Sequence, residues 1–209
     1  MITLIHPTRG RAAKSAKTVN NWLQKAANEV EVLVSIDADD PEKSNYLHYH
    51  KGREVFINQN TSVVEATNVV CPYAAGDLLL YLSDDFDCPD YWDVMIESEF
   101  KGVDGPCLLK VDDCLQPFDN TVLTIPIMNK ALYNKLNYFW HPDYKSMFVD
   151  VDLFFTCKDY IKYAPTLKFP HLHHSLGHCE NDATYKNSEK NWKSGEIIYK
   201  RRQAEGFSI

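Results

Sequence analysis

Three carboxylates follow an apolar run in the stretch LLLYLSDDFDCP, which covers residues 78–89. Asp84, Asp85 and Asp87 lie within four positions, and like charges so close together repel one another unless a cation lies among them. Mg²⁺ and Mn²⁺ prefer carboxylate oxygens and often keep water or substrate phosphates as further ligands. The spacing therefore predicts a divalent metal at the end of a buried strand. A Lys or Arg partner, or a solvated turn before a helix near Asp90, is the alternative.

A histidine-rich stretch, FPHLHHSLGH, covers residues 169–178. If it is extended, its side chains alternate, so that His171 and His173 point to one face and His174 to the other. Two imidazoles on one face are suited to binding a metal. The same pattern also fits a surface cluster, or a structural zinc site that Cys179 completes.

Two further acids lie in SMFVDVDLFF, residues 146–155. Asp150 is expected to cap a helix and to present its carboxylate at the helix mouth, with Asp152 two positions on. The flanking apolar residues would raise the pKa of the Asp150 carboxyl, which suits a general base. A capping role alone is the alternative. The flanking residues are Met147, Phe148, Phe154 and Phe155.

A basic turn follows the first apolar segment, in HPTRGR, residues 6–11. Its two arginines, Arg9 and Arg11, carry the forked guanidinium group that binds phosphate well. The stretch matches neither GxGxxG nor GxxxxGK[ST], so neither a Rossmann dinucleotide site nor a P-loop is predicted.

Predicted strands place these groups together. Continuous apolar runs separated by helical patterns indicate a doubly wound α/β unit, with a parallel sheet covered on both faces. Ligands bind such sheets at the carboxyl ends of the strands, which is where the polar residues lie. We expect strands at 2–6, 31–37, 54–58 and 78–82, and helices after Arg11 and over 62–75. In the less regular second half we expect strands at 107–111 and 121–128, and helices at 129–137 and 148–161.

Length and composition favour one soluble domain. The chain has 209 residues, of which 44% are hydrophobic and 24% charged. Its six cysteines form no CxxC pair, which predicts reduced thiols rather than a disulfide framework. No stretch approaches the roughly 18 apolar residues of a membrane span, and the start shows no leader pattern, so we expect a cytoplasmic protein.

The formal charge of −7 argues against a general nucleic-acid coat, but basic residues cluster near both ends of the chain, where they could bind an anion. The clusters are Arg9, Arg11, Lys14 and Lys17, and Lys186, Lys190, Lys193, Lys200, Arg201 and Arg202.

Taken together, these motifs resemble glycosyltransferases of the GT-A fold, in particular family 2-like enzymes, including small forms of the type found in phages. The resemblance covers roughly residues 2–185 and rests on the order of its motifs. PTRGR resembles the nucleotide-binding start, VSIDADD a second strand ending in an acid that contacts the base, and AAGDLLLYLSDDFDCP the DxD segment. YFWHPDYKSMFVDVDLFF resembles the acceptor segment that carries the catalytic base, and HLHHSLGHCENDATY the late histidine segment.

The resemblance implies a role for each candidate residue. Ser83-Asp84-Asp85 or Asp85-Phe86-Asp87 serves as the metal triplet, so Asp85 is the first metal ligand, and one imidazole completes the shell. Asp150 is the catalytic base, with Asp152 as the alternative. The implied metal ligands are Asp85, Asp87, His171 and His173, and the implied donor-binding residues are Pro7, Thr8, Arg9, Arg11, Asp37, Asp39 and Asp84.

The implied reaction moves a sugar from a nucleotide-sugar donor, a UDP-sugar in the first instance, to an acceptor hydroxyl with inversion, assisted by Mn²⁺ or Mg²⁺. Residues 1–100 would form the nucleotide-binding half and residues 101–209 the acceptor-binding half. The acceptor is a saccharide or glycolipid, or a hydroxymethylated base in DNA that the C-terminal basic run would hold by its phosphates. A sugar nucleotidyltransferase, a metal-dependent phosphohydrolase and a non-catalytic nucleotide-sugar-binding module are the rival interpretations.

Overall fold

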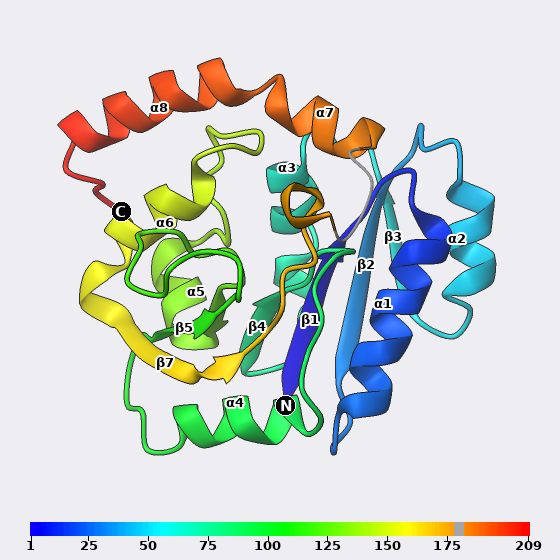
Figure 1. Cartoon of the computed structure of the whole chain (residues 1–209), viewed down its shortest axis with the longest axis horizontal. Coiled ribbons are helices and arrows are strands. Elements are labelled where there is room, and N and C mark those ends of the chain that lie inside the picture. Colours follow the sequence, from blue (N-terminus) through cyan, green and yellow to red (C-terminus); the bar gives the residue numbers. More distant parts are fainter. Residues whose placement is uncertain (178–181) are drawn as a thin grey trace.

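A seven-stranded sheet forms the centre of the computed structural model, which describes residues 1–177 and 182–209 (Figure 1). Its strands are β1 (Ile2–Pro7), β2 (Glu31–Asp37), β3 (Glu54–Asn58), β4 (Leu78–Tyr81), β5 (Leu108–Asp112), β6 (Ile127–Asn129) and β7 (Ile161–Lys168). They lie in the order β3-β2-β1-β4-β6-β5-β7. Neighbours are parallel except that β6 is antiparallel to β4 and β5. The predicted α/β fold with a mostly parallel sheet is confirmed.

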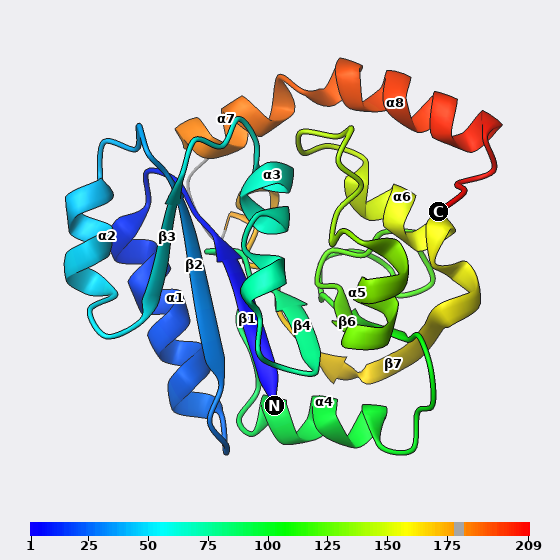
Figure 2. The same ribbon diagram turned by 180° about the vertical axis from the view of Figure 1, so that it is seen from behind.

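Helices cover both faces of the sheet, as strands that are apolar on both sides require (Figures 1 and 2). One face carries α1 (Ala12–Lys25), α2 (Lys43–Tyr49) and α4 (Trp92–Phe100), and the other carries α3 (Val63–Asn68), α5 (Lys130–Leu136) and α6 (Val149–Thr156). Adjacent strand residues supply the two core layers: on β1, Leu4 joins the first layer and Ile5 the second. No helix within the described ranges combines the length and apolar composition of a membrane span.

Helix α1 links the first core layer to the acidic turn after β4. Its buried Ala12, Ala16, Val19 and Trp22 recur every three or four residues, so they form one apolar face. The Trp22 ring packs against Trp92 at a centroid distance of 4.9 Å. The helix ends at Ala26, whose backbone is extended. The amphipathic spacing expected after Arg11 is therefore confirmed.

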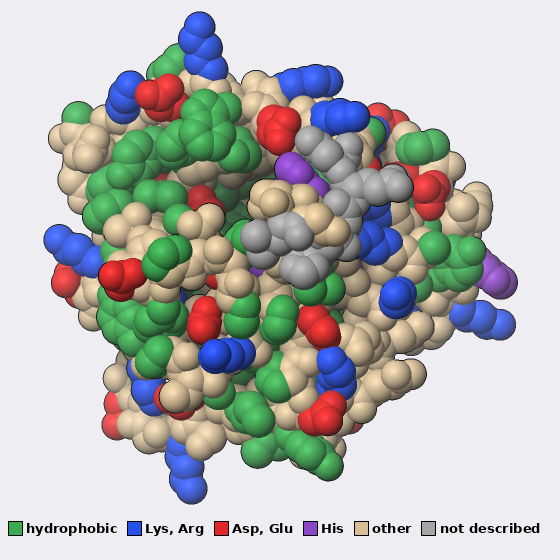
Figure 3. All heavy atoms as spheres, viewed as in Figure 1, with side chains coloured by type: hydrophobic (Ala, Val, Ile, Leu, Met, Phe, Trp, Pro, Cys, Tyr) green, Lys and Arg blue, Asp and Glu red, His purple; other side chains and the backbone are tan. Residues whose placement is uncertain are grey.

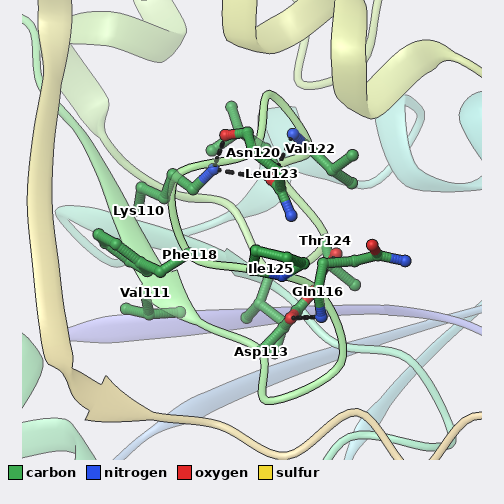
Figure 4. Close-up of a pocket in the computed structure, with 11 residues that line it drawn as sticks. Lys110, Val111, Asp113, Gln116, Phe118, Asn120, Val122, Leu123, Thr124 and Ile125 are labelled. Carbon is green, nitrogen blue, oxygen red and sulfur yellow. Dashed lines mark hydrogen bonds between the residues drawn. The ribbon is translucent and has the colours of Figure 1, made fainter.

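The segment before β6 differs from the predicted strand at 121–128, because only Ile127–Asn129 pairs in the sheet. Residues 116–125 instead form a loop beside the buried Lys110, whose ammonium donates to the backbone and amide oxygens of Asn120 (Figure 4). Pro126 also lacks the amide proton that a central strand needs. A buried ammonium group requires hydrogen-bond acceptors, and the loop supplies them by packing over Lys110.

β7 and α2 are among the elements that the sequence patterns did not predict. β7 is an edge strand interrupted by Pro165 and by charged side chains, so its sequence lacks the apolar run of a central strand. α2 lies in a stretch that the sequence indicated only as polar, and it buries a single side chain, Tyr46. The helix expected over 62–75 ends at Asn68 and is followed by a short 3₁₀ turn, Cys71–Tyr73.

The last two helices, α7 (Ala183–Glu189) and α8 (Trp192–Ala204), form a C-terminal arm across the carboxyl edge of the sheet (Figures 1 and 2). Gly195 allows the arm to approach closely, because a Cβ atom there would lie 2.5 Å from the carbonyl oxygen of Met147. The backbone of α8 therefore rests directly on the segment that precedes α6.

A buried ion pair fixes the far end of this arm. Arg202 Nε lies 3.0 Å from Asp152 Oδ2, and the two side chains are 4% and 1% exposed. The hydroxyls of Tyr144 and Thr156 also donate to Asp152, each at 3.0 Å. Each side chain neutralises the other inside the protein, which argues against Asp152 as the alternative base and against Arg202 as a phosphate contact.

The charge partners of α8 give a test of this arrangement. Arg202→Met leaves the Asp152 carboxylate buried without its cation, and we expect the free energy of unfolding to fall by about 3–5 kcal/mol. Lys200→Met is the control, since the exposed pair of Lys200 with Glu196 contributes at most about 1 kcal/mol. Urea denaturation of both variants measures the difference. Equal losses would contradict a structural role for the Arg202–Asp152 pair.

Candidate active site

A cleft of about 990 Å³ opens at the carboxyl edge of the sheet, beneath the C-terminal arm. Figure 3 shows the hollow with histidine side chains at its rim. Of the predicted site residues, all but Asp87 and Asp152 line it. The cleft brings together Pro7, Thr8, Arg9, Arg11, Asp37, Asp39, Asp84, Asp85, Asp150, His171 and His173.

The acidic turn after β4 is held from below by α1. Thr18 donates its hydroxyl to the Asp84 carbonyl at 2.7 Å, and the Trp22 indole donates to the Phe86 carbonyl at 3.0 Å. The Asp84 carboxylate accepts from the Thr8 hydroxyl at 3.0 Å and lies 3.3 Å from His6 Nε2. These contacts bind the turn to the ends of β1 and α1, so its carboxylates have fixed positions.

Asp85 carries a buried negative charge with one free oxygen. Its Oδ2 accepts from the Tyr185 hydroxyl and lies 3.1 Å from His171 Nε2, while its Oδ1 is buried without a hydrogen-bond partner. Burial tends to raise the pKa of Asp85, but the interactions with His171, then Ser83 and Tyr185, outweigh it and hold the pKa well below its ordinary value. The carboxylate is therefore ionised at neutral pH.

This free oxygen fits a divalent cation, for which an ionised carboxylate is a preferred ligand. Within residues 1–177 and 182–209, no group of three or more His, Cys, Asp or Glu side chains is arranged to hold a metal by itself. A metal at Asp85 would therefore take substrate phosphates and water as its other ligands, as Mg²⁺ and Mn²⁺ commonly do. On those terms the residues present fit the ion.

Asp87 lies apart from this group. Its carboxylate accepts from Lys25 Nζ and from Asn21 Nδ2, both at 2.7 Å on α1. It does not line the cleft. These contacts argue against Asp87 as a metal ligand and support the alternative of a lysine partner at this position.

The histidines gather in one cluster with Tyr185. His171 forms an isolated bridge with Phe86, while His174 begins a 3₁₀ turn, so the chain is not extended beyond His173. The ring of His173 lies 5.0 Å from that of His171 and 4.2 Å from that of His174. The expectation that His174 faces the opposite way is therefore wrong. Cys179, proposed to complete a zinc site, lies outside the described residues.

On the β1–β2 side, Arg9 joins two predicted base-contacting acids. Its Nη1 donates to Asp37 Oδ2 at 2.5 Å and to Asp39 Oδ1 at 2.6 Å. These contacts lower the pKa of the Asp39 carboxyl. The three side chains form a polar wall at the ends of these strands.

Arg11 is nearly buried and ties the C-terminal arm to the acidic turn. It donates from Nε and Nη2 to the two oxygens of Asp182, at 2.7 and 2.6 Å. Its Nη1 lies 3.8 Å from Asp84 Oδ2, and its guanidinium group lies over the Tyr185 ring. A cation is therefore already present beside the acidic pair.

Asp150 lies at the opposite side of the cleft, in the first turn of α6. It does not cap the helix as expected, because Phe148 occupies the cap position with a left-handed φ of 72°. Burial raises the pKa of the Asp150 carboxyl. A carboxylate with a raised pKa in a cleft has the properties of a general base.

Sequence reasoning missed Tyr185 and Asp182, the two arm residues that contact Asp85 and Arg11. Asp182 does carry a local signal, since it caps α7 by accepting from the Thr184 and Tyr185 amides. Its contact with Arg11 spans 171 positions of sequence, and no local pattern predicts it.

Solved structures share this arrangement of strands and helices, whereas no protein-family model and no curated protein sequence matches the chain. Residues 1–349 of TarS from S. aureus, solved in complex with UDP, superpose with a TM-score of 0.63 at 13% identity. Mannosyltransferase PcManGT from Pyrobaculum calidifontis, in complex with GDP-Man and Mn²⁺, gives 0.64 at 13% identity. The chain has the GT-A fold.

The matches cover most of this chain and only part of the larger proteins. They include 80% of this chain and 59% of the TarS fragment, and 81% of this chain and 56% of PcManGT. Glucosyl-3-phosphoglycerate synthase from Mycobacterium tuberculosis, in complex with Mn²⁺, UDP and glucosyl-3-phosphoglycerate, has a TM-score of 0.60 at 12% identity. That match covers 85% of this chain and 75% of the synthase. At these identities the likeness establishes the fold alone.

The opposite pKa shifts of two cleft carboxyls predict opposite effects on stability. The folded state holds the Asp150 proton more tightly than the unfolded state does, so ionisation of Asp150 costs stability as the pH rises above about 4. We therefore expect Asp150→Asn to be more stable than the wild type at pH 7, with the gain lost at low pH.

Asp85→Asn is the matched comparison. The pKa of Asp85 is lowered in the folded state, so its charge stabilises the fold above about pH 4, and this contribution is lost as the pH falls through the folded-state pKa. The asparagine variant should be less stable than the wild type at pH 7. Chemical denaturation from pH 3 to pH 7 in metal-free buffer measures both. The same sign of change in the two variants at pH 7 would disprove this description of the site.

Proposed function

We propose that this protein is a glycosyltransferase that moves a sugar from a nucleotide-sugar donor to an acceptor hydroxyl, with a divalent metal and with inversion at the anomeric carbon. The observation that carries the proposal is the pair of unlike carboxyls in one cleft. Asp85 is ionised with a free buried oxygen, and Asp150 has a raised pKa. The GT-A fold, shared with structures that contain UDP or GDP-Man, supports this reaction class.

The donor would lie along the ends of β1, β2 and β4. Asp37 and Asp39, joined by Arg9, offer carboxylate oxygens to the donors on a nucleobase, while Pro7 and Thr8 line the path toward the acidic pair. This assignment makes residues 1–100 the nucleotide-binding half, and residues 101–209, which carry Asp150, the acceptor-binding half.

The diphosphate would meet the acidic turn, where Asp85 and His171 offer ligand atoms for Mn²⁺ or Mg²⁺ and Asp84 lies beside them. The metal, when bound, supplies positive charge that stabilises the departing nucleoside diphosphate. Arg11, 3.8 Å from Asp84, adds a fixed cation at the same place. His173 does not contact Asp85 directly, so its role as a ligand is the weaker assignment.

Asp150 would act as the general base. It accepts the proton of the acceptor hydroxyl while that oxygen forms a bond to the anomeric carbon and the bond to the diphosphate breaks on the opposite face. Partial burial keeps the carboxylate basic, because its charged form is less well solvated than in water. This single displacement inverts the anomeric configuration.

A saccharide is the favoured acceptor, and hydroxymethylated DNA is the less favoured one. Of the six cations in the basic run that DNA would need, three are paired within the protein: Arg202 with Asp152, Arg201 with Asp143 and Lys200 with Glu196. Cations already paired within the protein release fewer counterions from a phosphate backbone.

The first functional test replaces one carboxylate of the DDFD stretch at a time. We expect Asp85→Asn to abolish Mn²⁺-dependent hydrolysis and transfer from UDP- and GDP-sugars, because it removes the charged oxygen offered to the metal. Asp87→Asn is the matched control and should retain turnover, since Asp87 contacts α1 outside the cleft. Radiolabelled sugar release measures both. Equal activity in Asp85→Asn and the wild type would refute the metal assignment.

A second functional test concerns the proton acceptor. Asp150→Asn should lower kcat for transfer by about 10²–10⁴-fold with the donor Kd unchanged, because a general base acts in the transition state. Donor calorimetry and initial rates measure the two quantities. Retention of the anomeric configuration in the product would rule out the single displacement.

Donor binding without turnover in the wild type would favour a binding module, and release of a sugar phosphate would favour a nucleotidyltransferase or a phosphohydrolase.

A further inference from the structure

Trp192 is the one tryptophan of the four whose indole is open to solvent. It is 54% exposed, whereas Trp22, Trp92 and Trp140 are 0%, 0% and 4% exposed. It begins α8 and lines the same cleft as Asp150. An indole that is accessible on a cleft wall suits a ligand contact, because ligand pockets are lined mainly by apolar and aromatic side chains.

The position of Trp192 is fixed relative to Asp150. Its ring packs edge-on against Phe148 at a centroid distance of 4.9 Å, and Tyr199 supports Phe148 from the same helix at 5.7 Å. A left-handed backbone is rare for a bulky residue, and Phe148 holds it two positions before Asp150. The close approach of Gly195 to Met147 joins the same two segments.

We propose that Trp192 is the stacking platform for a sugar ring of the acceptor, which places the reacting hydroxyl at Asp150. The inference rests on the proposed function and names its acceptor site. A pyranose has an apolar face of C–H groups and a rim of hydroxyls, so it needs an apolar wall edged by polar groups. Asn187 and Asn191 line the cleft beside Trp192, and their amides can donate to and accept from hydroxyls.

The donor side lies elsewhere in the cleft. Arg9, Asp37 and Asp39 belong to the ends of β1 and β2, whereas α8 runs toward α6 on the other half of the sheet (Figure 1). Trp192 therefore belongs to the wall that carries the base and not to the wall assigned to the nucleotide.

A flipped DNA base could also stack on an exposed indole. A DNA strand would further require unpaired cations beside the platform, because phosphate contacts dominate its affinity. The cations farther along α8 are paired internally. Lys190 and Lys193, which are close to Trp192 in the sequence, do not line the cleft, whereas Lys145 and Glu189 do. The cleft residues near Trp192 therefore carry charges of both signs, which favours a saccharide over a phosphate backbone.

Trp192 itself reports the binding step without any donor. Its fluorescence should shift to shorter wavelength when the wild type is titrated with methyl glycosides of glucose, galactose and N-acetylglucosamine, and with cellobiose and lactose. Trp192→Phe should show no fluorescence shift but should still bind sugar, as measured by saturation-transfer NMR. Trp192→Ala should show neither the shift nor sugar binding. Ile197→Ala, which alters an exposed α8 residue outside the cleft, should behave as the wild type does.

Kinetics then separates a platform from a structural role. With a saccharide acceptor, Trp192→Ala should raise the acceptor KM by about tenfold, whereas Trp192→Phe should keep the acceptor KM close to the wild-type value. The donor Kd should be that of the wild type in both variants. No sugar-dependent shift in the wild type, or a shift only with a hydroxymethylated DNA oligonucleotide, would overturn the proposal. Donor binding and hydrolysis by the wild type test the glycosyltransferase assignment separately, so failure of one is distinguishable from failure of the other.

Discussion

The buried charge of Asp85 is the constraint on which the rest of the site depends. A carboxylate that is 3% exposed stays ionised only if donors surround it, and the turn after β4 that carries Asp85 supplies too few of them. His171 and Tyr185 provide the contacts from 86 and 100 positions further along the chain. The C-terminal region must therefore fold back over the carboxyl edge of the sheet. Both contacts fall on Oδ2, which leaves Oδ1 as a buried oxygen without a hydrogen-bond partner, and this is the oxygen assigned above to the metal.

Arginine pairs set the position of the C-terminal arm at both of its ends. Arg11 holds Asp182 just before α7, and Arg202 holds Asp152 from the last turn of α8. Bidentate or buried guanidinium contacts fix orientation as well as distance, which a flexible lysine would do less well. Between them, Gly195 brings α8 onto the backbone before α6. The C-terminal arm, which covers the cleft, is thus held in a fixed position relative to α6, which carries Asp150.

The first half of the fold was predictable because its strands are apolar on both faces and its turns carry clear signals. β2 and β3 match their predicted bounds, and β1 and β4 differ by one residue. The second half was predicted only in part: β5 and α5 lie within one residue of their predicted bounds, and α6 begins as expected but ends at Thr156. β7 is an edge strand with Pro165, and the burial of Lys110 shapes the 116–125 loop, so neither was predicted. Eleven predicted site residues line one cleft because strand ends of a parallel sheet meet at one edge. Tyr185 was missed because its role comes from a contact across the fold.

Both aspartates that fell outside the cleft stand two positions from one that lies in it, and this spacing explains the error. Successive pairs i and i+2 on a helix are about 200° apart, so Asp150 faces the cleft while Asp152 faces the core and Arg202. In the turn after β4, Phe86 is buried between Asp85 and Asp87, which leaves Asp87 directed at Lys25. One carboxylate of each pair, Asp85 or Asp150, therefore lines the cleft, and the other binds a basic residue of a neighbouring helix. The sequence shows four equivalent acids, and only the direction of each side chain separates reactive groups from structural ones.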